Sequence, residues 1–263
     1  MRNEKLLYVS SGVTVVDAEI IAEAIEFLRS HVPPEGYFVG FSGGKDSIVI
    51  LDLVRKSGVT HQAYYTWTTI DPPEILRFIR KYYPDVTILR PTLSFWAYIE
   101  QRGILPTRTR RWCCDKLKKD PSKHIPLLHR VFGIRREESA RRATYTRIDN
   151  APRRKKEKHY YPIIEWTEGD VWDYIEVNNL PYPSLYDEGF DRIGCIICPF
   201  VTGRKLLIHK ARWPGMYRAL DAILIARYPK SKTLLTLDEW MKYPDWPTKA
   251  ERERARMQGR LWE

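Results

Sequence analysis

Six consecutive residues, 42–47, carry the clearest chemical signal in the chain. They lie between an apolar segment at 37–41 and a segment with a helical pattern at 47–56. Two glycines let the backbone approach a ligand closely, and unpaired N–H groups at a helix start attract phosphate oxygens. The pattern therefore predicts a phosphate-binding loop, formed by Ser42, Gly43, Gly44, Lys45, Asp46 and Ser47.

The side chains of this loop have distinct expected roles. Ser42 and Ser47 would add hydroxyl donors, and Lys45 would stabilise the charge that builds up on a leaving pyrophosphate. Asp46 would position magnesium or a backbone group of the loop. The spacing differs from the G-x-x-x-x-G-K-[ST] pattern of the Walker A loop, so the two loops are not equivalent.

Four cysteines form two pairs, a vicinal pair and a C-x-x-C pair, separated by the 80 residues 115–194. Four thiolates with no spare cysteine suggest one site with four ligands, which would hold zinc or an iron–sulfur cluster. A vicinal pair is awkward for a zinc knuckle, which favours the cluster, while zinc and unliganded thiols stay open. The predicted ligands are Cys113, Cys114, Cys195 and Cys198.

Basic residues flank these candidate sites. Arg108, Arg110 and Arg111 precede the first cysteine pair and would bind an anion beside the cluster, or be solvated. Residues 135–158 hold ten Arg or Lys beside four Asp or Glu. With few large apolar side chains, this stretch predicts a mobile basic loop near a ligand.

The elements that must position these residues alternate between strands and helices, which predicts an α/β fold with a mainly parallel sheet covered by helices on both faces. Beyond Pro199 the pattern becomes helical and aromatic, so we expect one domain at 1–200 and a helical extension at 201–263. The predicted strands are 37–41, 62–66, 86–89 and 131–134. The predicted helices are 16–31, with Asp17 as its cap, 47–56, followed by Gly58, and 73–83, 94–102 and 168–178.

Composition narrows the class of protein. Hydrophobic residues make up 43% of the 263, enough for a substantial core, and the formal net charge of +11 favours polyanionic partners. No signal peptide or run of about 18–20 apolar residues is visible. We therefore expect a cytoplasmic protein with no membrane partner, and we leave a homodimer open.

The loop resembles the PP-loop of ATP pyrophosphatases, S-G-G-x-D-S, and matches it at every fixed position. The wider stretch 35–200 resembles the phosphoadenosine phosphosulfate (PAPS) reductase family, and the cysteine spacing is similar to the [4Fe–4S] motif of adenylylsulfate reductases. The landmarks are Thr69, Pro73-Glu74, Arg111 to Cys114, Gly133 to Arg135, Glu138-Ser139, and Gly194-Cys195 with Cys198-Pro199.

The resemblance implies a Rossmann-like fold of the adenine nucleotide alpha hydrolase type, with ATP, Mg²⁺ and a [4Fe–4S] cluster as cofactors. It also implies a catalytic role for Arg135 beside Lys45 and Asp46. Arginine forks suit phosphate geometry, so the region after Gly133 would cover the phosphate or sulfate side of the ligand. The further nucleotide-binding residues that the resemblance implies are Thr69, Glu74, Arg135, Glu138, Ser139 and Arg142.

One departure from the reductases bears on function. Their nucleophilic cysteine lies in a Glu-Cys-Gly-like tail, whereas no cysteine follows Cys198 here. The sequence is also similar to the ATP pyrophosphatases of DNA phosphorothioation (the DndC and SspD types). We therefore expect ATP cleavage to AMP and pyrophosphate that activates an acceptor for sulfur insertion.

The basic charge of the chain indicates which acceptor to expect. We expect DNA, contacted by residues 135–158, with a cysteine desulfurase or another protein as the sulfur donor. The alternatives are a reductase of adenylylsulfate or phosphoadenylylsulfate in sulfate assimilation, a tRNA thiolase, and a non-catalytic nucleotide-binding sensor that uses the cluster.

Overall fold

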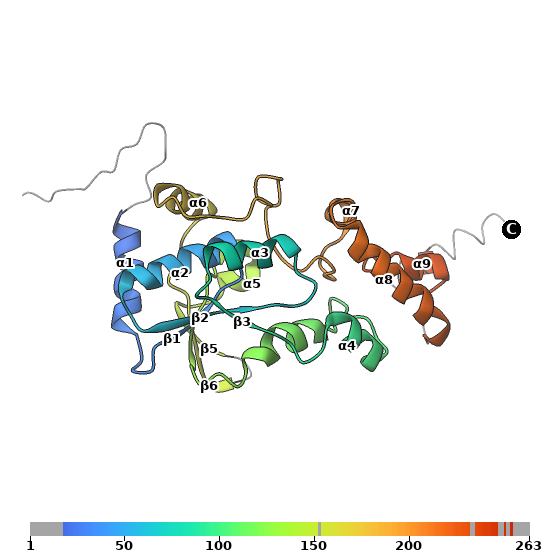
Figure 1. Cartoon of the computed structure of the whole chain (residues 1–263), viewed down its shortest axis with the longest axis horizontal. Helices are drawn as coiled ribbons and strands as arrows, with labels where there is room; N and C mark the ends of the chain where they lie inside the picture. The colour runs from blue at the N-terminus through green and yellow to red at the C-terminus, as the bar shows by residue number, and fades with distance from the viewer. Residues whose placement is uncertain (1–17, 152–153, 232–234, 247–249, 251–252, 255–263) are drawn as a thin grey trace, which may run out of the picture. The chain divides into compact units, whose positions relative to one another are not determined.

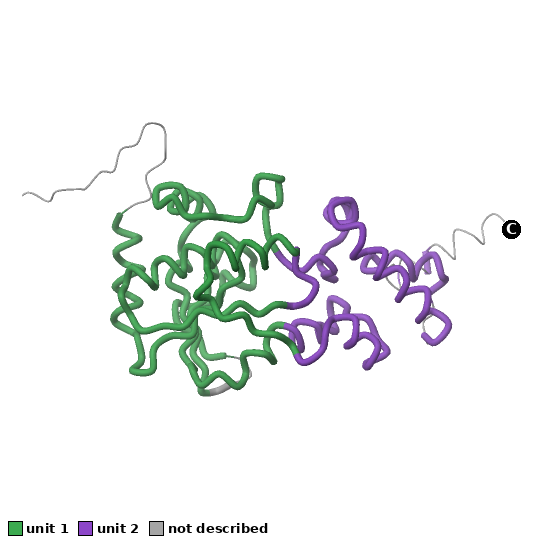
Figure 2. The backbone as a smooth tube through the Cα atoms, in the orientation of Figure 1, with its two compact units in different colours: residues 1–67, 73–91, 118–193 green, residues 68–72, 92–117, 194–263 purple. Residues whose placement is uncertain are grey.

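The computed structural model describes residues 18–151, 154–231, 235–246, 250 and 253–254. The chain divides into two compact units (Figure 2). The first unit comprises residues 1–67, 73–91 and 118–193, and the second comprises residues 68–72, 92–117 and 194–263. The predicted division at residue 200 stays a prediction.

A six-stranded sheet forms the centre of the first unit, in the order β3-β2-β1-β4-β6-β5 (Figure 1). All neighbouring strands are parallel except β5 and β6, which are antiparallel. The predicted α/β fold with a mainly parallel sheet is therefore confirmed. The strands are β1 (Tyr37–Gly40), β2 (His61–Thr66), β3 (Thr87–Leu89), β4 (His129–Val131), β5 (Ile148–Ala151) and β6 (Arg154–Tyr160).

In the first unit, α2 packs against α1 and α6 and also contacts β1. Most residues of the α2 helix are buried, and those from Ile48 to Leu51 are fully buried. Gly58 ends it in the left-handed conformation with a φ of 73°, as predicted. The helices are α1 (Ala18–Ser30), α2 (Lys45–Ser57), α3 (Pro73–Tyr82), α5 (Ala140–Ala143) and α6 (Glu168–Val177), with short 3₁₀ turns η2 (Asp120–Ser122) and η3 (Arg136–Glu138).

The second unit is helical. Trp213, Tyr217 and Trp240 are buried in it, which confirms the predicted helical and aromatic C-terminal region; Trp262 and the Asp17 cap lie outside the described residues. Its helices are α4 (Phe95–Arg102), α7 (Gly203–Arg212), α8 (Pro214–Arg227) and α9 (Leu237–Met241), with the 3₁₀ turn η4 (Tyr228–Lys230). The π-helical turn η1 (Cys114–Lys119) begins in the second unit and ends in the first.

The prediction of a loop over residues 135–158 was wrong. The described part of this stretch folds into η3, α5 and the strands β5 and β6. β6 pairs with β4, and across that pair the buried Arg130 Nε lies 3.1 Å from Glu157 Oε2. Because the buried carboxylate is matched across the strands while Lys156 and Lys158 face solvent, a lysine-rich segment can form an inner strand.

β4 is also held from the side by η2. The Arg130 guanidinium donates to Ser122 Oγ and to Ser122 O at 2.9 and 2.8 Å, and it lies 4.3 Å from the centre of the Phe38 ring. Hydrogen bonds, an ion pair and an aromatic face thus surround one buried cation and join β1, β4, β6 and η2.

No helix within the described residues is long and apolar enough to cross a lipid bilayer.

Gly133, just after β4, offers a test of this packing. A Cβ at this position would lie 2.6 Å from the backbone oxygen of Asp46, so Gly133→Ala must push two loops apart. We expect it to lower the free energy of unfolding by about 1–3 kcal/mol, measured by urea denaturation. As a control, Gly169→Ala, whose Cβ would meet Thr167 at an ordinary 3.5 Å, should be neutral; equal stability of both variants would contradict this packing.

Candidate functional site

The loop from Ser42 to Ser47 connects β1 to α2 and is held together by its own serines. Ser47 Oγ donates to Gly44 O at 2.8 Å and accepts from the Ser42 N–H at 3.1 Å. The two hydroxyl oxygens lie 3.1 Å apart. Both predicted hydroxyl donors are therefore used first to shape the loop.

The glycines of the loop are required by its close packing. Gly43 has a φ of 73°, and a Cβ there would lie 3.0 Å from a methyl carbon of Ile75, on α3. Gly44 stands at the N-cap of α2, and no side chain caps that helix start. The first turn of α2 is therefore open to partners from elsewhere in the chain.

One such partner is Tyr186, which the sequence did not single out. The backbone N–H of Lys45 donates to the Tyr186 hydroxyl at 2.9 Å. A phosphate oxygen bound at a helix start would accept from such an N–H group, so the phenol stands where an anion would bind. Burial raises the pKa of Tyr186, which keeps the hydroxyl neutral.

The Lys45 side chain is buried, with only 5% of its surface exposed. Its ammonium lies 3.0 Å from Glu168 Oε1 and donates to Asp191 O at 3.1 Å. The rings of Trp172 and Tyr186 lie 6.0 and 5.4 Å from it. The predicted phosphate-binding cation is therefore neutralised inside the unit by a half-exposed carboxylate.

Asp46 and Arg135 form an ion pair across the loops that follow β1 and β4. Arg135 Nε lies 2.6 Å from Asp46 Oδ1, and the arginine, only 2% exposed, also pairs with Glu137. Burial opposes the arginine's charge, but the hydrogen bonds and charges of Asp46 and Glu137 outweigh it and raise the pKa of Arg135. The guanidinium therefore stays charged.

The residues after Arg135 organise this second loop. The backbone N–H of Arg135 donates to Glu138 Oε2 at 3.0 Å, and Glu138 forms an ion pair with Arg142. Ser139 Oγ accepts from the Arg142 N–H at 3.3 Å and caps α5. These three predicted ligand residues thus lie together, held by one another.

These two loops meet at the topological switch point of the sheet. β1 and β4 are neighbours, yet the chain continues from β1 to β2 on one side and from β4 to β5, beyond β6, on the other side. In open α/β sheets, ligands bind outside the carboxyl ends of strands at such a point. The fold therefore gathers residues 42–47 and 135–142 at the position where a ligand is expected.

Two further predicted residues lie elsewhere. Glu74 stands in the first turn of α3, in the first unit. Thr69 belongs to the second unit, where it has a positive φ of 68° and its Oγ1 accepts from the Phe95 N–H at 2.9 Å. The structure thus places Thr69 in a different compact unit from the loop.

All four cysteines lie in the second unit. Cys113 hydrogen bonds with Cys114, and this contact, its burial and the nearby charges of Cys114, Cys195 and Cys198 together raise the pKa of Cys113. Cys113 therefore lies within electrostatic reach of the other three cysteines, although no three His, Cys, Asp or Glu side chains in the described residues are arranged around a metal position.

Arginines join the two cysteine segments within this unit. Arg111 Nη2 donates to Cys114 Sγ at 3.6 Å, and its guanidinium lies 4.9 Å from the Phe200 ring centre. Arg108 Nε donates to Pro199 O at 3.2 Å. Of the arginines before the first cysteine pair, Arg111 thus contacts a sulfur, whereas Arg108 contacts the backbone after the second pair.

The Asp46–Arg135 pair generates a stability test. Asp46→Asn keeps the side-chain shape but leaves the buried arginine poorly compensated, so we expect a loss of about 3 kcal/mol in the free energy of unfolding. The matched control is Asp85→Asn, which breaks the exposed 2.6 Å pair with Arg55 and should cost no more than about 1 kcal/mol. Thermal and urea unfolding would measure both; equal losses would contradict the importance of the buried pair.

Comparisons with known proteins agree with this architecture. The protein MJ0973 of Methanocaldococcus jannaschii is 31% identical over 212 residues, covering 78% of this chain and 51% of that relative. The adenosine 5′-phosphosulfate reductase of Oceanobacillus iheyensis is 31% identical over 184 residues, covering 66% of this chain and 75% of the reductase. The chain spans about half the length of the two Methanocaldococcus relatives it matches.

Among solved structures, the phosphoadenylyl-sulfate reductase of Candida auris, a phosphate complex, aligns with a TM-score of 0.54 at 21% identity, over 70% of this chain and 98% of that one. The Candida glabrata FMN adenylyltransferase bound to FMN and an ATP analogue aligns with a TM-score of 0.53 at 15% identity, over 72% of this chain and 66% of that one. At these identities the likeness concerns the fold, and it confirms the predicted Rossmann-like class.

The model of the phosphoadenosine phosphosulfate reductase domain matches residues 36–201. This range contains the loop after β1, the loop after β4 and both cysteine pairs. The chain therefore belongs to the phosphoadenosine phosphosulfate reductase domain family.

Proposed function

We propose that this chain is an ATP pyrophosphatase that activates an acceptor for sulfur insertion. The observation that carries the proposal is the Ser42–Ser47 loop, which opens α2 at the switch point opposite Arg135. An acceptor oxygen would attack the α-phosphorus of ATP, the bond to the bridging oxygen would break, and pyrophosphate would leave with the electron pair. A sulfur nucleophile would then displace AMP from the adenylylated acceptor.

The roles of the loop residues follow from their contacts. A triphosphate oxygen would replace the Tyr186 hydroxyl as the acceptor of the Lys45 N–H hydrogen bond. The Lys45 ammonium would leave Glu168 and form an ion pair with the leaving pyrophosphate. Arg135 stays charged beside Asp46, and the phosphate that reacts would replace one of the two carboxylates that pair with it.

A carboxylate is a suitable ligand for the magnesium ion that usually accompanies ATP. Asp46 is the carboxylate of the loop, and its exposed fraction of 19% leaves it accessible. Asp46 would hold Mg²⁺, which would supply charge neutralisation on the phosphates.

The four cysteines would hold a [4Fe–4S] cluster. Their fit rests on the donor set: four thiols in one compact unit, Cys113 within electrostatic reach of the other three, and the Arg111 guanidinium on one sulfur. Arginine hydrogen bonds to sulfur tune such clusters. The cluster would supply electrons or labile sulfide for the sulfur step, with a cysteine desulfurase as a donor partner.

DNA is the acceptor that we favour, with phosphorothioate modification as the outcome. The support is the excess of basic residues, which gives a net charge of +11 and suits a polyphosphate partner.

Reduction of adenylylsulfate is the second candidate, and the relatives favour it. Reductases of Oceanobacillus iheyensis and Bacillus subtilis are 31% and 29% identical to this chain. The cysteines of the 263 residues are the four of the two pairs, so a thiosulfonate formed within this sequence would occupy a predicted cluster ligand. Sulfite release from adenylylsulfate with thioredoxin would favour the reductase over the pyrophosphatase.

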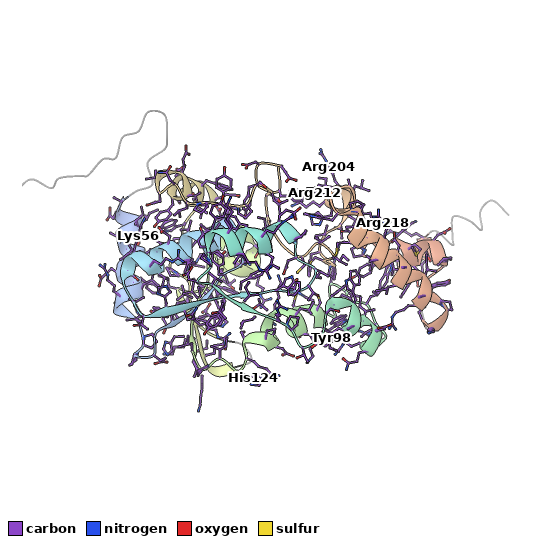
Figure 3. The ribbon with its side chains drawn as sticks, in the orientation of Figure 1. Lys56, Tyr98, His124, Arg204, Arg212 and Arg218 are labelled. Carbon is purple, nitrogen blue, oxygen red and sulfur yellow. The ribbon has the colours of Figure 1, made fainter. Side chains whose placement is uncertain are left out.

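The nucleotide chemistry predicts a specific product. With Mg²⁺, ATP, duplex DNA and a cysteine desulfurase, the protein should release pyrophosphate and AMP. Lys45→Ala should lower this rate by about 10²–10³-fold, because it removes a cation that stabilises the leaving group. Lys56→Ala, at the far end of the same helix (Figure 3), is the matched control and should retain activity. Release of ADP and orthophosphate would refute the assignment.

The metal prediction has a readout that does not depend on activity. Anaerobically purified protein should be brown, with four iron and four sulfide per chain, because thiolate–iron charge transfer absorbs visible light. Cys113→Ser and Cys198→Ser should each lose most of this colour, whereas Thr109→Ala, at an exposed position before the first pair, should keep it. Colourless protein with one zinc per chain would overturn the prediction.

A further inference from the structure

We propose that duplex DNA docks through its phosphate backbone on the second unit, along the exposed side of α7, and not on the basic residues 135–158. This inference rests on the proposed function in one respect, the choice of DNA as the polyanion. It assigns a surface that the sequence pattern did not identify.

Both cysteine segments of the second unit are basic and lack acidic residues. Residues 194–220 contain five Arg or Lys and no Asp or Glu, and residues 101–114 contain four Arg and no Asp or Glu. In a chain with 33 acidic residues among 263, such stretches concentrate positive charge locally. A phosphate backbone passing over them meets no carboxylate from these segments.

The α7 helix presents this charge to solvent. Leu206 is its only buried residue, and Arg204 and Lys205 are exposed. Arg218 is exposed on α8, the helix that packs against α7. Figure 3 shows the side chains of Arg204, Arg212 and Arg218 around α7. Arginine at such positions can bind phosphate oxygens through its fork of N–H groups.

The start of α7 is not part of the proposed surface. The Gly203 N–H donates to Asp245 Oδ2 at 2.9 Å, so a carboxylate already occupies the helix N-terminus. We therefore place the phosphates along the side of the helix, where the arginines project.

The surface contacts the segment that contains the second cysteine pair. Tyr217 OH donates to Ile196 O at 3.0 Å, and His209 Nδ1 lies 3.2 Å from the same oxygen. Ile196 lies between Cys195 and Cys198. The helices α7 and α8, which carry the basic side chains, thus both contact the C-x-x-C turn. DNA bound on α7 would therefore lie on the helix that packs against the second cysteine pair.

Exposed apolar side chains accompany the charge. Leu207 and Phe200 are 67% and 53% exposed, and the Arg111 guanidinium lies against the Phe200 ring. Apolar and aromatic groups next to phosphate-binding arginines contact sugars and bases in nucleic-acid interfaces. This combination fits DNA better than a purely ionic partner.

Four of the five arginines in residues 135–147 already have carboxylate partners. Arg135 pairs with Asp46 and Glu137. Three more form the ion pairs Arg136–Glu165, Arg142–Glu138 and Arg147–Glu23. A DNA phosphate would have to displace these carboxylates, which offsets the gain of each new contact. Four of the ten basic side chains in residues 135–158 are therefore already matched by carboxylates of the first unit.

The test compares two variants that each remove two positive charges. Arg204→Gln with Arg218→Gln changes the proposed surface, and Lys156→Gln with Lys158→Gln changes exposed lysines of β6. Binding of a fluorescent DNA duplex is measured over a salt series, without ATP. The first variant should bind at least about tenfold more weakly at low salt and flatten the log–log salt slope by about 2, one for each phosphate that the variant no longer neutralises. The second variant should behave like the wild type.

Three outcomes would overturn the proposal: no DNA binding by the wild type at low salt, a larger effect from the β6 variant, or displacement of DNA by poly-glutamate as efficient per charge as by unlabelled DNA. The last outcome would indicate an acidic protein partner instead. Unchanged circular dichroism and melting temperature would show that both variants fold.

The same measurements separate this inference from the proposed function. Pyrophosphate release with normal cluster content but no binding on α7 would refute only the surface. Binding on α7 without pyrophosphate release would refute only the pyrophosphatase.

Discussion

The ion pair between Asp46 and Arg135 is the interaction on which the candidate site depends. A guanidinium that is 2% exposed must be matched by a carboxylate, since an unpaired buried charge would cost several kcal/mol. Asp46 lies in the first turn of α2, and Arg135 follows β4, so the pair fixes the loops of two neighbouring parallel strands. Gly133 allows the backbones to approach closely enough. The position of the loop is therefore set by the Asp46–Arg135 ion pair and by Gly133, which has no side chain.

The same principle governs the rest of the loop. Lys45 is buried because Glu168 and the Asp191 carbonyl satisfy its ammonium, and the first N–H of α2 has the Tyr186 hydroxyl as its partner. An anion at this helix start must replace the phenol, so its net binding free energy is a difference between two sets of hydrogen bonds. This replacement also makes the loop selective. A ligand must supply an oxygen acceptor in place of the Tyr186 hydroxyl and a negative charge in place of Glu168.

The sequence predicted β1, the loop and α2 well, because an apolar strand, two glycines and an apolar helix are local signals. It did not predict Glu168, Tyr186 or Asp191, which come from a segment more than a hundred residues away with no periodic pattern near Tyr186. β5 and β6 were missed because the burial of Glu157 depends on Arg130 of a neighbouring strand, which no local pattern reveals. Thr69 follows β2 in sequence, as the family pattern expects, yet it belongs to the other compact unit.

Net charge describes the whole chain, whereas binding depends on which charges remain available. Arg135, Arg136, Arg142 and Arg147 pair with carboxylates of the fold, so an anion must compete with those carboxylates to bind them. In the second unit, the basic side chains lie in segments that contain both cysteine pairs and no acidic residues. A positive environment attracts phosphodiesters. If the thiols hold a cluster, the arginines that stabilise its negative charge and the arginines that bind phosphate belong to the same basic region of the second unit. Arg111, which donates to Cys114, then stabilises the sulfur. The basic side chains along the side of α7 then bind the phosphate.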